Sequence, residues 1–197
     1  MFKRTKGYFL LTMLVLTGLA GRLHTNILTT KERHTLVAEL KTSKKDLRKC
    51  VEDLSAKQLN FKANKNTPSI KECIYELVSI ESSLWASAQN ALNEEPSSIQ
   101  KTVWDDKRLI AIAEQGKNFQ HKALKFKNIK EALKFYKSER TEMLRYVQTS
   151  TQNVRQHVTK TSFGNFDAYQ LMLLNTIYAE KYIQKIEEIK AHPNFPK

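Results

Sequence analysis

Residues 69–92 read SIKECIYELVSIESSLWASAQNAL and decide the class of fold. The apolar residues of this stretch recur every three or four positions, which is the period of one face of an α-helix. They are Ile70, Cys73, Ile74, Leu77, Leu84, Trp85 and Ala88. Ser69 and Glu72 have the spacing of a capping box, and Pro68 stands just before them. The stretch therefore predicts a long amphipathic helix that ends at about Leu92.

Three further segments show the same periodicity, from Lys31 to Leu54, from Ile129 to Thr149 and from Asp167 to Pro193. Each begins beside a residue suited to a helix N-terminus: Thr29, Asn128 and Asp167. Because only five Gly and four Pro interrupt 197 residues, the sequence predicts an all-α protein built as a four-helix bundle. A weaker pattern at residues 104–113 predicts a short extra helix between the second and third long helices, across the end of the bundle.

The first residues have the features of a secretory signal. Three basic residues among the first six precede an apolar run from Tyr8 to Ala20, which is too short for a comfortable membrane span. We therefore expect residues 1–24 to be a signal peptide cleaved near Ala20, or alternatively an uncleaved N-terminal anchor. Residues 28–197 then form the bundle domain. The protein is expected to be exported, to the periplasm, and to contact a membrane only through an uncleaved leader.

The chain has two cysteines, Cys50 and Cys73. Export would place them in an oxidising compartment, and antiparallel packing of the first two long helices would bring them together. A disulfide between Cys50 and Cys73 and a pair of separate, reduced core thiols both agree with the sequence.

The formal charge of +13 raises the question of an anionic partner. Lysines recur through every segment and are interleaved with Glu and Asp, which is typical of a solvated outer surface. The densest basic run lies between Lys122 and Lys137, and no aromatic platform or recognition motif accompanies it. We therefore predict no specific nucleic-acid binding, and we keep a basic binder of nucleic acid or anionic membrane as an alternative.

Four runs of the chain resemble one protein family. They are DLSAKQLNFK at 53–62, PSIKECIYEL at 68–77, GNFDAYQ at 164–170, and QKIEEIK at 184–190 followed by NFP at 194–196. In this order and spacing they resemble the DinB-like superfamily of bacterial four-helix bundles, also described as DinB/YfiT-like metalloenzymes. The resemblance implies this fold over nearly all of the chain after the leader. It also implies pairing into a homodimer through helix faces.

The resemblance further implies three histidine ligands for Zn or Ni, one on the second long helix and two at i, i+4 on the fourth. This chain departs from that pattern, because the corresponding residues are Glu76, Tyr178 and Tyr182. A phenol must lose its proton before it binds a divalent ion, which lowers its affinity at neutral pH. We therefore predict a degenerate metal site without a metal cofactor, in which tyrosine rings fill the space of the ion and its ligands.

The histidines offer no replacement for these ligands. They lie far apart in the sequence, with no i, i+3 or i, i+4 pair among them: His24, His34, His121, His157 and His192. We expect His34, His121 and His157 to be surface residues.

Glu81 and Arg140 each interrupt the apolar stripe of a helix. Because an isolated buried charge is costly, we expect Glu81 to be paired or hydrogen-bonded, with Arg140, Tyr178 or Tyr182 as its partner. Such a polar cluster is either a lock inside the core or the floor of a remnant pocket.

These observations leave three hypotheses for function. The first, which we favour, is a non-catalytic exported bundle that binds an unidentified small molecule or protein partner. The second is a metal-dependent hydrolase or thiol transferase of the DinB/YfiT-like type, with a changed ligand set around Glu76, Tyr178 and Tyr182. The third is the basic binder. The sequence contains no nucleophile elbow, Cys-x-x-Cys pair or phosphate-binding Gly-rich loop.

Overall fold

A computed structural model gives the fold and describes residues 28–97, 106–114, 119 and 121–197. The predicted signal segment, residues 1–24, lies outside the described residues, as does the start of the short helix expected at 104–113. None of the helices that the structure describes is both long and apolar enough to cross a membrane.

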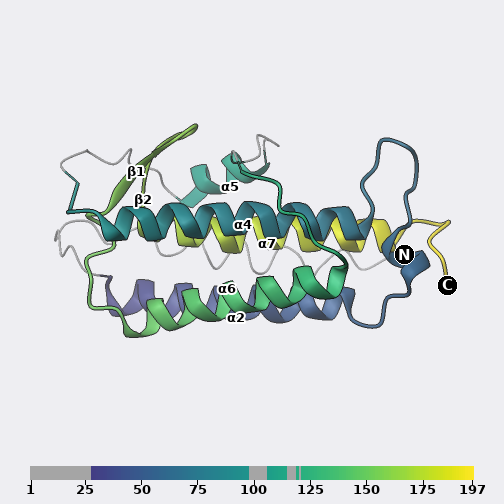
Figure 1. The fold of residues 1–197 in the computed structure, drawn as a ribbon, viewed down its shortest axis with the longest axis horizontal. Helices are drawn as coiled ribbons and strands as arrows, with labels where there is room; N and C mark the ends of the chain where they lie inside the picture. Colours follow the sequence, from purple (N-terminus) through teal and green to yellow (C-terminus); the bar gives the residue numbers. More distant parts are fainter. Residues whose placement is uncertain (1–27, 98–105, 115–118, 120) are drawn as a thin grey trace.

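Four long helices form the bundle, and they are α2 (Thr30–Val51), α4 (Ile70–Asn93), α6 (Ile129–Thr149) and α7 (Ala168–Lys190). α7 packs against α2 and α4, and α6 packs against the same two helices, so the four close into a ring around one core. Figure 1 shows α4 and α7 in one layer and α2 and α6 in the other. The predicted all-α four-helix bundle is confirmed.

Capping residues fix where the helices begin. Thr29, Ser69 and Asp167 each form a reciprocal capping box with the third residue that follows. Asn128 accepts a hydrogen bond from the backbone N–H of Glu131 at 3.0 Å, but the Glu131 carboxylate binds the backbone N–H one residue before the cap. The helix starts predicted from these residues are therefore confirmed.

α7 is enclosed on all sides over its first half, because every residue from Ala168 to Ala179 is buried. The short helix α5 (Asp106–Glu114) packs against α7 from outside the ring, and Lys181 donates a hydrogen bond to the carbonyl oxygen of Ala113. The extra helix expected at 104–113 is thus present. It lies beside α7 and not across the end of the bundle, as Figure 1 shows.

The segment after α2 differs from its expected course. The helix ends at Val51 and not at Leu54, because Asp53 adopts a left-handed backbone conformation with a φ of 64°. A single helical turn, α3 (Ala56–Leu59), follows α2.

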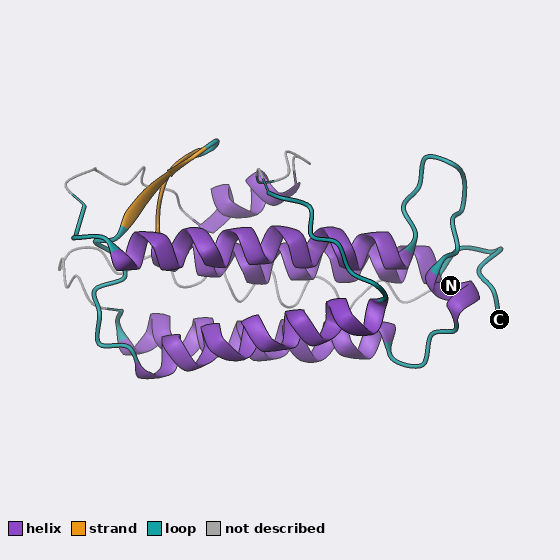
Figure 2. Cartoon of the chain, viewed as in Figure 1, coloured by secondary structure: helices purple, strands orange, loops and turns teal. Residues whose placement is uncertain are grey.

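A short antiparallel hairpin, which the sequence pattern does not predict, leads into α7. Its strands are β1 (Val158–Thr161) and β2 (Gly164–Asp167), which pair along their full length at one end of the bundle (Figure 2). Arg155 ties this hairpin to the helices through ion pairs with Asp167, at 3.0 Å, and with Glu32 of α2. The hairpin therefore fixes the entry of the chain into α7.

Candidate functional site

The residues predicted to replace metal ligands meet where α4 faces α7. Glu76 comes from α4, and Tyr178 and Tyr182 lie one turn apart on α7. Tyr178 is fully buried and Tyr182 is 5% exposed, whereas the Glu76 side chain is 38% exposed. The Glu76 carboxylate lies close enough to Tyr182 to act electrostatically on its phenol. The structure thus brings the three predicted positions together.

Both phenols in this cluster are held in the protonated form. Burial raises the pKa of Tyr178 and of Tyr182 above the ordinary value for tyrosine, and the Glu76 carboxylate raises the pKa of Tyr182 further. The Tyr178 hydroxyl oxygen accepts a hydrogen bond from the backbone N–H of Phe119 at 3.3 Å. Neither ring is prepared to act as an anionic ligand, since metal ligands of this type must first be deprotonated.

His121 lies beside Glu76, although the two residues are far apart in the sequence. Its Nε2 is 3.3 Å from Glu76 Oε1, and its Nδ1 is 2.8 Å from the carbonyl oxygen of Phe119. Both ring nitrogens of His121 therefore already have a partner, the Glu76 carboxylate at Nε2 and the Phe119 carbonyl oxygen at Nδ1.

The expected surface positions of the histidines are confirmed only for His34. The His121 side chain is 12% exposed, so the expectation is wrong for this residue. His157 is 4% exposed, and its Nδ1 lies 2.9 Å from the carbonyl oxygen of Ala91. In the part of the chain that the structure describes, no three His, Cys, Asp or Glu side chains gather closely enough to hold a metal ion.

The inward polar cluster is centred on Arg140 of α6. Its Nε donates to Glu81 Oε2 at 2.8 Å, and its Nη2 donates to Glu81 Oε1 at 2.6 Å. Nη2 also donates to the carbonyl oxygen of Asn175 at 2.8 Å, and Nη1 donates to Ser43 Oγ at 3.3 Å. Since Glu81 belongs to α4, Asn175 to α7 and Ser43 to α2, one guanidinium joins all four long helices.

This arrangement is that of a lock inside the core. Arg140 is 1% exposed and Glu81 is 4% exposed, so neither side chain is open to a ligand from solvent. Burial acts to raise the pKa of the Glu81 carboxyl, and the guanidinium of Arg140 opposes that effect. The sequence indicated Glu81 and Arg140 as polar interruptions of apolar stripes. It gave no sign of Ser43 or of the Asn175 carbonyl, because such small or backbone acceptors do not disturb a hydrophobic pattern.

Cys50 and Cys73 are free, buried thiols, and no disulfide joins them. Burial raises the pKa of Cys50 to about 12 and the pKa of Cys73 to about 11. Both groups are therefore protonated at neutral pH, and a protonated thiol is a poor nucleophile and a poor metal ligand.

The lysines between Lys122 and Lys137 are exposed, as expected. Beside them lies an aromatic row that the sequence pattern does not predict. Phe135 is 36% exposed, its ring centroid lies 5.8 Å from that of Phe126, and Phe126 lies 5.4 Å from Tyr75. The row was missed because its members come from α4, from the segment before α6, and from α6 itself.

Comparison with known proteins identifies one family. The family model described as the DinB superfamily matches residues 39–177, which is more than half of the chain. No curated protein and no solved structure matches the chain. The matched range includes Glu76, Glu81 and Arg140 and ends at Ile177, within α7 and one residue before Tyr178.

Proposed function

This chain belongs to the DinB superfamily, and from that premise we propose that it is a non-catalytic, exported member with a degenerate metal site. On this proposal it binds a small molecule or a protein partner. The observation that carries the proposal is the chemistry at Glu76, Tyr178 and Tyr182, where two buried, protonated phenols stand beside a carboxylate that an imidazole already contacts.

These side chains do not fit the Zn or Ni ion that the family resemblance implies. Such an ion is held by lone pairs of neutral imidazole, thiolate or carboxylate. Here the raised pKa values keep both tyrosines protonated, and Glu76 and His121 already contact each other. No reaction step is therefore assigned to a metal in this protein.

Other features also favour binding over catalysis. The thiols are buried and protonated, and the polar atoms of Glu81 and Arg140 are hydrogen-bonded to each other across the helices. The basic and apolar pattern of residues 1–24 supports export. A thiol-dependent reaction suits an exported protein poorly, because small thiols are mainly cytosolic.

Metal content tests the proposal. The full chain is expressed with its leader and purified without added metal, and Zn, Ni and Fe are measured by elemental mass spectrometry. We expect far less than one equivalent in the wild type and in Glu76→Ala. Glu94→Ala is the matched control, because Glu94 is an exposed acid at the end of the same helix. Stoichiometric metal that is lost in Glu76→Ala and kept in Glu94→Ala would instead support the hydrolase or transferase alternative.

The same sample reports on export and assembly. Intact mass shows whether the leader is removed near Ala20, and an uncleaved chain found in the membrane fraction would support the anchor alternative. Light scattering gives the oligomeric state, for which the family resemblance leads us to expect a homodimer.

A second candidate function is favoured by the aromatic row beside the exposed lysines. Phe135 gives the basic surface an apolar group that can enter a lipid headgroup layer or stack on a base. Binding to anionic vesicles and to random duplex DNA is measured at rising salt, with Phe135→Ala as the variant. Salt-sensitive binding would support this candidate, and the lack of binding at low salt would dismiss it.

A further inference from the structure

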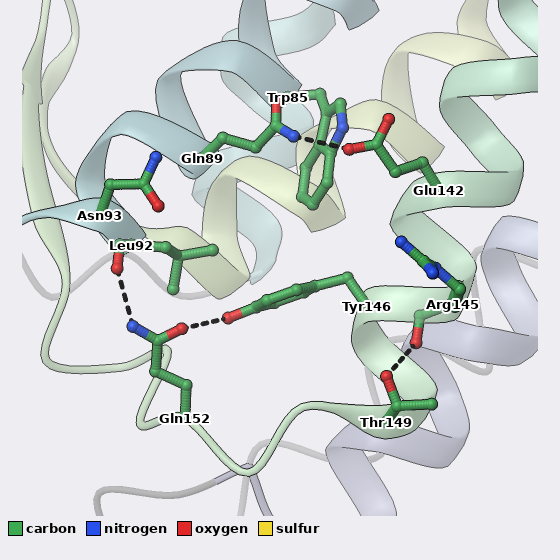
Figure 3. A pocket seen from close by; sticks show the side chains of 9 residues that line it. All are labelled: Trp85, Gln89, Leu92, Asn93, Glu142, Arg145, Tyr146, Thr149 and Gln152. Atoms are coloured by element: carbon green, nitrogen blue, oxygen red, sulfur yellow. Dashed lines mark hydrogen bonds between the residues drawn. The ribbon is translucent and has the colours of Figure 1, made fainter.

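A pocket of about 360 Å³ opens between the C-terminal halves of α4 and α6, outside the Glu76 cluster and the Arg140 network. Figure 3 shows the indole of Trp85 between the α4 side chain of Gln89 and the α6 side chain of Glu142, with Tyr146 below. A volume of this size lies within the range of small-molecule sites, for which about 300 Å³ is the lower bound.

The floor of the pocket is fixed by hydrogen bonds. The Tyr146 hydroxyl donates to Gln152 Oε1 at 2.9 Å, and Gln152 Nε2 donates to the carbonyl oxygen of Leu92 at 2.7 Å. The rings of Trp85 and Tyr146 meet edge to face with centroids 5.8 Å apart. These contacts fix the aromatic side chains before a ligand binds, so binding costs little side-chain entropy.

One polar atom in the wall has no hydrogen-bond partner among the residues that the structure describes. Trp85 is 2% exposed, and its Nε1 is buried without a hydrogen-bond acceptor. An indole N–H that is withdrawn from water without an acceptor costs free energy in the unliganded protein. The neighbouring side chains of Gln89 and Glu142 are joined by one hydrogen bond, from Gln89 Nε2 to Glu142 Oε1 at 2.8 Å.

Two opposite charges line the same pocket one helical turn apart. Glu142 and Arg145 are both exposed on α6 at i, i+3 spacing, which allows an ion pair. Nevertheless, within the described part of the chain Glu142 is bonded to Gln89, and the Arg145 guanidinium has neither Glu142 nor another side chain as a partner. The pocket thus offers an acceptor and a donor that do not satisfy each other.

We propose that this pocket binds a small zwitterion with an apolar body, of the class of aromatic or branched α-amino acids. The ligand ammonium binds Glu142, its carboxylate binds Arg145, and its body packs against Trp85 and Tyr146. A simple anion would be attracted by Arg145 and repelled by Glu142, and a simple cation would meet the reverse, so the pair selects a molecule that carries both charges. This inference rests on the proposed function, because it names the ligand class for a binding protein.

The test uses fluorescence of the full chain. The sequence has two tryptophans, so Trp104→Phe leaves Trp85 as the sole reporter. The probes are phenylalanine, phenylacetate and 2-phenylethylamine, which share one ring and differ in charge. We expect a saturable change with phenylalanine, with a dissociation constant on the order of 1 mM. Each single-charge probe should bind at least about tenfold more weakly.

Two variants assign the charges. Arg145→Ala should weaken phenylalanine binding about tenfold or more, so that its affinity equals that of 2-phenylethylamine. Glu142→Gln should likewise lower the affinity for phenylalanine to that for phenylacetate. Lys130→Ala, an exposed change at the other end of α6, should leave all three affinities unchanged. Circular dichroism melts confirm that each variant is folded. Equal binding of the three probes, or no saturable signal from any of them, would overturn the inference.

Failure here is distinct from failure of the proposed function, because metal is measured on the same preparations. A metal-free protein that does not bind phenylalanine contradicts only the inferred ligand class. A protein that binds phenylalanine as expected and also carries stoichiometric metal contradicts only the loss of the metal site.

Discussion

Arg140 and Glu81 face each other in the centre of the bundle as a doubly hydrogen-bonded pair, with donor–acceptor distances of 2.8 and 2.6 Å. The pair is buried, and the arginine is also bonded to α2 and α7. Breaking a buried pair from one side leaves an uncompensated charge, whereas replacing both members by apolar residues of similar volume is often neutral.

Glu81→Leu should therefore lower the free energy of unfolding by about 3 to 5 kcal/mol. The double variant Glu81→Leu, Arg140→Met should lose clearly less free energy of unfolding than Glu81→Leu alone, since no buried charge remains. Urea unfolding followed by circular dichroism measures both. Glu94→Ala, at an exposed position, should stay within about 0.5 kcal/mol of the wild type. A loss below about 1 kcal/mol in Glu81→Leu would contradict the charged, buried state of Arg140.

Glu139 should make the protein less stable as the pH rises. Burial raises the pKa of Glu139 to about 7 from an ordinary value of 4.5, and the hydrogen bond from Ser82 only partly offsets this. The unfolded chain releases this proton at lower pH than the folded chain, so stability falls between about pH 4.5 and 7 and then levels off. Glu139→Gln should remove about 1 to 2 kcal/mol of this loss, after allowance for solvent screening.

Urea unfolding at several pH values between 4 and 8 measures this effect as the difference between the wild type and Glu139→Gln. Taking the difference removes the contributions of other titrating groups, among them the half-buried Glu39 and Glu180, whose pKa values burial also raises. Parallel curves for the two proteins would mean that Glu139 is solvated in the folded state.

Restoring the three family ligands should restore metal binding. The triple variant Glu76→His, Tyr178→His, Tyr182→His places one imidazole on α4 and two at i, i+4 on α7, in the space that the tyrosine rings now fill. We expect about one equivalent of Zn or Ni and a rise in melting temperature on adding the metal. The matched control is Glu94→His with Tyr146→His, which adds imidazoles at the C-terminal ends of α4 and α6, away from this cluster. A folded triple variant without metal would show that these positions do not correspond to the family ligands.

The two thiols should be unreactive while the protein is folded. Burial raises the pKa values of Cys50 and Cys73, so almost no thiolate is present near pH 8. Ellman's reagent should react slowly with the native protein and rapidly, at two sites, after unfolding in guanidinium. If the unfolded, unreduced protein shows no thiols and its mass is two hydrogens lower, the cysteines are paired in the exported protein.

Helix positions could be predicted because their signals are local. Ser69 with Glu72 and Thr29 with Glu32 are capping boxes within four residues, and the structure begins a helix after each. The end of α2 was misplaced because the apolar period continues to Leu54, whereas the backbone of Asp53 is left-handed.

The hairpin before α7 could not be predicted from such signals. Its strands are only four residues long, and the loop between them lacks the Asn-Gly or Asp-Gly pair that marks a two-residue turn. The side chain of Thr161 closes the loop instead, by donating to the carbonyl oxygen of Gly164 at 2.8 Å, and Gly164 supplies a φ of 121°. These devices are visible only in three dimensions.

In the candidate sites too, features with a local sequence signal could be predicted, and features that depend on the packing of distant segments could not. Glu81 and Arg140 were noticed because a charge on an apolar stripe demands a partner, and that demand is local. The contact of His121 with Glu76 was missed, because it depends on how the segment before α6 crosses α4. The Trp85 pocket was missed for a similar reason, since its two charges lie on α6 and its aromatic wall is shared with α4.

The hydrogen bonds that Arg140 makes to the three other long helices have a consequence for the rates of folding and unfolding. Its partners on α2, α4 and α7 are all in place only after the last helix has docked, so the transition state for folding should contain few of these bonds. Removing them should then accelerate unfolding far more than it slows refolding, which makes this guanidinium a determinant of how long a folded molecule survives.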